Sequence, residues 1–176
     1  EIFCASNMND VLTRFTASGT LEPKETMPTV APSMDIQIPS SLERLIYDLE
    51  GDTSSFYDQL QSQKVATLSE DATRKLQSIF SSKSFDDEMI LKEIKDFNKN
   101  YDWIVDPHTA TAVSEKVTFA SNLPVVGVAT ASPEKFSNVI SSVISSFSVK
   151  NSENTEDYIV CRSDSSTVEN TIKEYF

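Results

Sequence analysis

The stretch Ile2-Phe3-Cys4-Ala5-Ser6-Asn7-Met8-Asn9-Asp10 decides the fold. Its apolar residues are followed at once by a polar turn, which predicts a buried strand over residues 2–5. Asn9 or Asp10 can cap the helix that follows, and Gly19 ends that helix. In α/β proteins such strand-to-helix turns are places where side chains meet ligands, although the same residues can simply cap a helix.

Apolar residues at helical spacing recur along the rest of the chain. They predict helices over 41–49, 54–63, 69–79, 86–97, from Asp106-Pro107 onward, 132–145 and 165–175. We expect only short strands, at 82–85 (a strand or a turn), at 125–129, which reads as a buried parallel strand, and at 158–161. Four prolines predict an irregular connection over 20–39, and polar residues predict a loop over 148–157.

These elements predict one α/β piece over residues 1–176, with helices packed around a few short, mostly parallel strands. A net charge of −12 disfavours nucleic acid as a partner. No apolar run is long enough to cross a membrane. Two cysteines far apart in the sequence and one histidine argue against a disulfide framework or a metal site. The low cysteine content favours a reduced, cytoplasmic setting.

The residues alone leave the chemistry open. Thr130 and Ser132 follow the predicted strand at 125–129, where hydroxyl groups can meet a ligand, but the residues alone favour a structural use, in which Ser132 caps the next helix and Thr130 bonds to the backbone. The single histidine, His108, has Asp106 nearby but no nucleophile motif, which disfavours a catalytic triad. The chain contains only three glycines, Gly19, Gly51 and Gly127, and they lie far apart in the sequence. The known glycine-rich phosphate loops are therefore excluded.

Four segments resemble the threonine synthase family. They are ASNMND at 5–10, TVAPSMDIQIPSSLERLI at 29–46, DPHTA at 106–110 and ATASPEKF at 129–136. Their order and spacing also agree, and the resemblance covers essentially residues 1–150. It implies a fold-type-II pyridoxal 5'-phosphate enzyme, a lyase of threonine biosynthesis that converts O-phospho-L-homoserine and water to L-threonine and phosphate. In such enzymes the cofactor acts as the electron sink.

The resemblance also assigns roles to individual residues. Thr130 matches the position whose hydroxyl faces the pyridine nitrogen of the cofactor. His108, Thr109 and Asn9 match positions near the substrate. Ser132 replaces a family histidine, which puts any role of that imidazole in doubt here, and Ala112 replaces a glycine.

By the same resemblance, the Schiff-base lysine and the cofactor's phosphate loop lie in a segment before Glu1. We therefore expect the C-terminal portion of the large domain of a longer enzyme, with no catalytic residue of its own and no activity alone. Two alternatives stay open: a related lyase for another phosphorylated substrate, and a non-catalytic interaction domain. Because a piece cut from a sheet exposes a strand edge, we also expect the isolated chain to self-associate.

Overall fold

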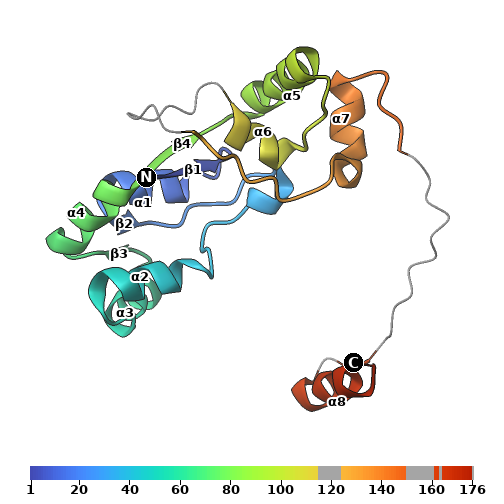
Figure 1. The fold of residues 1–176 in the computed structure, drawn as a ribbon. Helices are drawn as coiled ribbons and strands as arrows, with labels where there is room; N and C mark the ends of the chain where they lie inside the picture. The colour runs from blue at the N-terminus through green and yellow to red at the C-terminus, as the bar shows by residue number, and fades with distance from the viewer. Residues whose placement is uncertain (115–123, 150–160, 163, 176) are drawn as a thin grey trace.

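The parallel pair of strands β1 (Ile2–Ser6) and β4 (Phe80–Ser84) lies at the middle of the fold (Figure 1). Ile2 stands opposite Phe80 and Ser6 opposite Ser84, and the Phe85 N–H continues the ladder by donating to the Ser6 carbonyl at 2.9 Å. The structure is a computed structural model that describes residues 1–114, 124–149, 161–162 and 164–175.

The remaining elements are helices and one small antiparallel pair, β2 with β3. They are α1 (Val11–Ser18), β2 (Thr20–Leu21), η1 (Pro32–Met34), α2 (Leu42–Glu50), α3 (Ser54–Gln63), β3 (Ala66–Thr67), α4 (Glu70–Ile79), α5 (Asp87–Tyr101), α6 (Pro107–Val113), η2 (Pro133–Phe136), α7 (Ser137–Val143) and α8 (Ser165–Tyr175). The helix-rich α/β class with a few short strands is therefore confirmed, although only the longer strand pair is parallel.

The apolar residues form two separate cores, one on each side of the strand pair. The first core joins α1, α2, α3, α4 and the small antiparallel pair, and Phe15 meets Phe56 edge to face within it at 6.2 Å between ring centroids. The second core joins α5, α6 and α7, with Phe3 and Ala5 of β1 packed against it. Figure 1 shows the same division, with α1 to α4 at one end of the strand pair and α5 to α7 at the other.

Most helices begin and end where the sequence predicts. Ser69 caps α4 by accepting from the Ala72 N–H at 3.2 Å, and Asp86 caps α5 by accepting from the Met89 N–H at 2.7 Å. Gly19 and Gly51 end α1 and α2 in the left-handed conformation, which glycine adopts at least cost.

Three details of the elements differ from the sequence prediction. Asp10 stands at the start of α1 but makes no side-chain cap, because its carboxylate is paired with Arg14 at 2.9 Å. The helix predicted over 132–145 divides into η2 and α7, and the strands β2 and β3 were not predicted. The loop predicted at 148–157 and the strand at 158–161 lie mostly outside the described residues.

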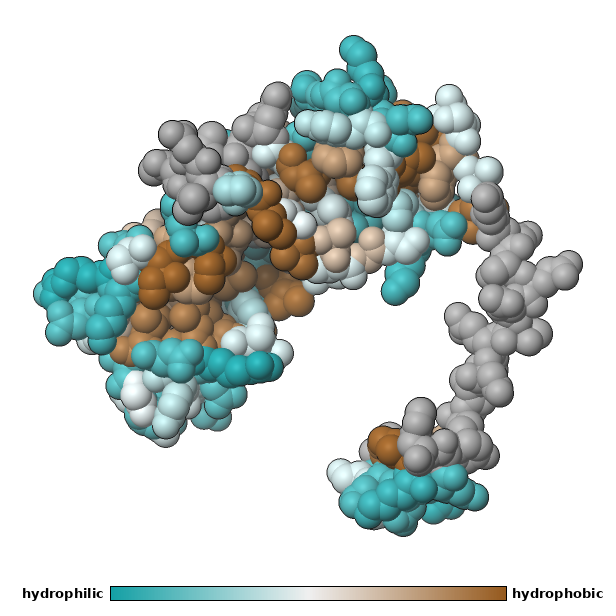
Figure 2. All heavy atoms as spheres, in the orientation of Figure 1, coloured by the Kyte–Doolittle hydropathy of each residue, from teal (hydrophilic) through white to brown (hydrophobic). Residues whose placement is uncertain are grey.

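The buried parallel strand predicted at 125–129 was wrong. This segment has no assigned strand pairing, and Val125, Val126 and Val128 are 57%, 83% and 68% exposed. A run of valines becomes a buried strand only beside a neighbouring strand and under a covering layer, and neither is present in the described part of the chain. Figure 2 shows apolar atoms at the surface where this extended segment runs in Figure 1.

Over the described residues, none of the helices combines the length and the apolar composition that a membrane span requires.

The two left-handed glycines make a matched pair for a stability test. At Gly51 (φ +80°) an added Cβ meets no atom within 4 Å, so Gly51→Ala should cost about 1 kcal/mol from backbone strain alone. At Gly19 (φ +71°) the added Cβ runs into the Thr73 side chain, with the Thr73 methyl 3.0 Å away. We expect Gly19→Ala to lower the free energy of unfolding by about 2 kcal/mol or more, measured by urea denaturation. Equal losses in the two variants would contradict the packing of α1 against α4.

Candidate functional site

The site is built on Asp106, the residue that caps the N-terminus of α6. One carboxylate oxygen, Oδ1, accepts the His108 backbone N–H at 2.9 Å and lies 2.8 Å from His108 Nδ1. The other oxygen, Oδ2, accepts the Thr109 hydroxyl. Burial alone raises the pKa of the Asp106 carboxyl, but these hydrogen bonds outweigh burial and hold that pKa below its usual range. Asp106 is therefore an ionised acceptor inside the protein.

His108 joins three segments that are far apart in the sequence. Its Nδ1 faces Asp106 on its own helix, and its Nε2 accepts the Ser33 backbone N–H of the η1 turn at 3.0 Å. Its ring packs on Phe136 of η2, with 4.6 Å between ring centroids and 57° between the planes. Since Nε2 is occupied by a backbone N–H, it cannot take a proton from a nucleophile in this arrangement, which argues against a catalytic triad.

A second polar cluster lies directly after β1. The Asp35 carboxylate accepts hydrogen bonds from the amides of Asn7 (2.7 Å) and Asn9 (3.0 Å), and from the backbone N–H and the hydroxyl of Thr29 (3.1 and 2.8 Å). Asn7 is fully buried and also donates to the Ala31 carbonyl at 3.2 Å. This cluster therefore holds the irregular segment over 24–37 against the end of β1.

The Asn9 side chain is committed to the same task. Its amide donates to the Met27 carbonyl at 2.8 Å and accepts from the Met27 N–H at 2.9 Å. The Gln37 amide donates to the same Asn9 oxygen at 3.1 Å. Asn9 is 2% exposed, so in this conformation its amide serves the protein itself.

Thr130 lies on the extended segment that leads into η2. Its side chain is exposed, and Ser132, two residues later, caps η2 by accepting the Glu134 N–H at 3.4 Å. The segment runs against the end of α6, because a Cβ at Gly127 would lie 3.2 Å from a Val113 methyl. The η2 turn that follows brings Phe136 onto the ring of His108. The segment that carries Thr130 is thus linked to α6 on both sides of Thr130, at Gly127 and at Phe136.

Sequence reasoning found only some of this site. It singled out Thr130, His108, Thr109 and Asn9, and their roles toward a ligand stay predictions. It missed the part played by Ser33, Asn7 and Asp35. One available signal was the sequence Ser6-Asn7-Met8-Asn9, because two amides that become buried directly after a strand need partners within the protein. No local pattern pairs them with Asp35, which is 28 residues away from Asn7.

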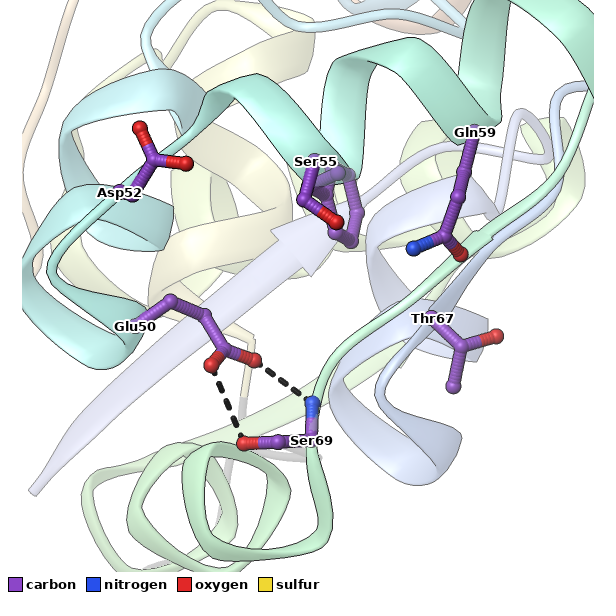
Figure 3. A pocket seen from close by; sticks show the side chains of 7 residues that line it. Glu50, Asp52, Ser55, Gln59, Thr67 and Ser69 are labelled. Carbon is purple, nitrogen blue, oxygen red and sulfur yellow. Dashed lines mark hydrogen bonds between the residues drawn. The ribbon is translucent and has the colours of Figure 1, made fainter.

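A polar hollow elsewhere in the fold holds none of the predicted site residues (Figure 3). It is lined by Glu50, Asp52, Ser55, Phe56, Gln59, Thr67 and Ser69. The Glu50 carboxylate accepts the Ser69 backbone N–H at 2.6 Å and the Ser69 hydroxyl at 3.1 Å, which are the dashed lines in Figure 3. Glu50 therefore ties the end of α2 to the start of α4, and Asp52, the other charged group of the hollow, accepts the Ser54 hydroxyl at 3.0 Å.

The chain is similar to known enzymes over most of its length. A threonine synthase from Pseudomonas aeruginosa is 29% identical over 147 residues, which are 80% of this chain and 31% of that protein. Human threonine synthase-like 1 is 29% identical over 168 residues, which are 91% of this chain and 22% of that protein. No protein-family model matches. The chain thus spans about a third or less of these curated relatives.

One solved structure matches nearly the whole chain. It is the threonine synthase from Brucella melitensis with pyridoxal phosphate bound, with a TM-score of 0.81 and 26% identity. The match covers 99% of this chain and 40% of that one. The family resemblance seen in the four sequence segments is therefore confirmed by the fold as well.

Two helix caps provide a test of the Asp106 cluster. Asp86→Ala removes one hydrogen bond at the start of α5 and should cost about 1 kcal/mol. Asp106→Ala removes the cap of α6 and also leaves the buried His108 ring N–H and Thr109 hydroxyl without an acceptor. We expect it to cost about 3 kcal/mol, from urea unfolding monitored by circular dichroism. A loss no larger than that of Asp86→Ala would show that the cluster is not buried as described.

Proposed function

The chain is a relative of the threonine synthases that spans about a third of their length, and we propose that it is the C-terminal part of the large domain of such an enzyme. In that proposal the whole protein is a fold-type-II pyridoxal-phosphate lyase of threonine biosynthesis in the cytoplasm. It converts O-phospho-L-homoserine and water to L-threonine and phosphate. The observation that carries the proposal is the match of 99% of the chain to a threonine synthase with pyridoxal phosphate bound.

The residues of this chain suit one side of a cofactor site. The exposed Thr130 hydroxyl can donate a hydrogen bond to an unprotonated pyridine nitrogen, which sets how strongly the ring withdraws electrons. When bound, pyridoxal phosphate supplies an electron sink for carbanion chemistry. The chain itself contains three glycines and no glycine-rich loop, so the cofactor phosphate must be held by another part of the protein.

The protein residues have distinct tasks in this proposal. Thr130 contacts the cofactor ring, and His108 and Thr109 shape the adjoining wall through their bonds to Asp106. Asn9 shapes the neighbouring wall by holding the segment at 27–37 in place. A closed, ordered wall positions the substrate and keeps out water that is not meant to react.

A second candidate substrate rests on one substitution. Ser132 stands where the family resemblance has a histidine, and its hydroxyl is used to cap η2. A site without that imidazole can select a different phosphorylated hydroxy-amino acid. Comparing phosphate release from several such substrates by the full-length protein separates the two candidates.

The proposal that residues outside this chain hold the cofactor makes a direct prediction. The full-length protein should release phosphate from O-phosphohomoserine and show the absorbance of bound pyridoxal phosphate. The 176-residue chain alone should do neither, because the lysine and the phosphate loop that hold the cofactor lie elsewhere in the proposed enzyme. Turnover by the isolated chain would sink the proposal.

A variant pair sharpens the same experiment. Thr130→Val in the full-length protein removes the hydroxyl and should lower the rate about tenfold, whereas Thr130→Ser keeps the hydroxyl and should stay close to the unaltered rate. Similar rates for Thr130→Val and the unaltered protein would remove Thr130 from the cofactor site.

The exposed valines lead to a prediction about association. Val125, Val126 and Val128 form an uncovered apolar run, which we propose is covered by another part of the full-length protein. The isolated chain should therefore form dimers or larger species in light scattering, and Val126→Asp should shift it toward monomer. Val149→Asp, at another exposed valine, is the control and should change nothing. A monomeric isolated chain would contradict this use of the segment.

A further inference from the structure

His108 is placed so that each of its two ring nitrogens has a single possible role. A backbone N–H can only donate, so His108 Nε2 must accept the hydrogen bond from Ser33 at 3.0 Å. The ring proton therefore sits on Nδ1, which donates to the Asp106 carboxylate at 2.8 Å. The ionised state of Asp106 agrees with this assignment, because a carboxylate accepts and does not donate.

The bond to Ser33 reaches a segment that has little backbone pairing of its own. Residues 22–41 contain only the short η1 turn, Pro32–Met34, and the Ser33 and Pro32 side chains are exposed there. On one side the turn is followed by Asp35, which the amides of Asn7 and Asn9 hold in place. On its other side the Ser33 N–H donates to His108 of α6. The residues next to Ser33 are held there too, because the Val30 N–H donates to Asp87 at 3.2 Å and Ala31 is buried in the second core.

The imidazole is itself held by two groups of the protein. Asp106 fixes the orientation of the ring through Nδ1, Phe136 covers one face, and the side chain is 6% exposed. A ring that is oriented in this way offers Nε2 at a fixed point in space, so it can locate a backbone group with little loss of side-chain entropy. The same geometry ties η1, α6 and η2 to one another.

We propose that His108 is a positioning residue, whose Nε2 clamps the Pro32–Met34 turn against the N-terminus of α6 and so sets the wall of the proposed active site. This inference deepens the proposed function, since the η2 segment that covers His108 is the one that carries Thr130 at its entrance. The Asp106–His108 pair acts on the turn rather than on the reacting atoms.

Two substitutions separate the two bonds of the ring. His108→Asn keeps an N–H near the place of Nδ1 for Asp106 but has no acceptor that reaches Ser33. His108→Gln places an amide oxygen near Nε2, where it can accept the Ser33 N–H, but lacks the donor to Asp106. The clamp predicts that the glutamine variant behaves like the unaltered protein at the turn and that the asparagine variant does not.

The first measurement is hydrogen–deuterium exchange in the full-length protein that contains this chain. In His108→Asn, peptides that contain Ser33 should exchange about tenfold faster, and in His108→Gln they should not. Peptides over 6–10, where the Asn9 N–H donates to the Asn7 side chain, are the internal control and should keep their rate in both variants. Unchanged exchange at Ser33 in His108→Asn, or equal acceleration of both regions, overturns the clamp.

A spectroscopic signature checks the proton position. In nitrogen-15 spectra of the unaltered protein, the His108 signals, identified by their loss in His108→Gln, should show a protonated Nδ1 and an unprotonated Nε2. The opposite tautomer overturns the assignment, because Nε2 could not then accept from Ser33.

Kinetics then connect the clamp to the proposed reaction. With O-phosphohomoserine as substrate, His108→Asn should lower kcat/KM about tenfold or more, and His108→Gln should recover most of that loss. If the exchange test succeeds but the unaltered protein does not turn over this substrate, the proposed function fails and the clamp stands. Equal kinetic losses in the two variants would overturn the role of the clamp in positioning the site.

Discussion

The fold depends on the rule that polar groups taken out of water must find partners. Residues 22–41 carry almost no regular structure, yet the middle of this segment lies against the end of β1. It can do so because the Asn7 and Asn9 amides and the Asp35 carboxylate satisfy the backbone groups that a helix or sheet would otherwise satisfy. No buried side-chain polar atom of the described residues is without a partner. Each of these hydrogen bonds adds little to the free energy of unfolding. Leaving one of the buried groups without its partner costs more free energy than the bond contributes when it is made.

The same rule explains why the region of the proposed site is ordered rather than loose. Asp106 accepts from three donors within four residues, which gives α6 a defined start and His108 a defined orientation. His108 in turn accepts the Ser33 N–H, and its ring packs on Phe136, which belongs to the segment that follows Thr130. A wall assembled from three chain segments keeps its shape only if the contacts between them are directional, and hydrogen bonds to fixed acceptors are more directional than apolar contacts.

Helix positions could be predicted from the sequence because their signals are local. Ser69 and Asp86 are caps that precede an apolar stripe, and Gly51 is a stop that needs no tertiary partner. The valine run at 125–129 could not be predicted correctly, since the same residues form a strand only when a neighbouring strand is present. The Asn7–Asp35 and Ser33–His108 pairs span 28 and 75 residues, and nothing in their own neighbourhoods specifies them. Within DPHTA, by contrast, the contact of Asp106 with His108 is local and could be anticipated.

The division into two cores has a consequence for how such a sequence can diverge. The buried residues of one core are not shared with the other, so a change of side-chain volume in α2 or α3 need not be compensated in α5 or α7. Each core can drift through its own series of compatible apolar residues. The polar residues of the Asn7–Asp35 and Asp106–His108 clusters have no such freedom, because an acceptor cannot be exchanged for a group of similar size. Relatives could therefore keep this fold while most of their apolar positions differ, with the shared identity gathered in short polar segments such as those at 5–10 and 106–110.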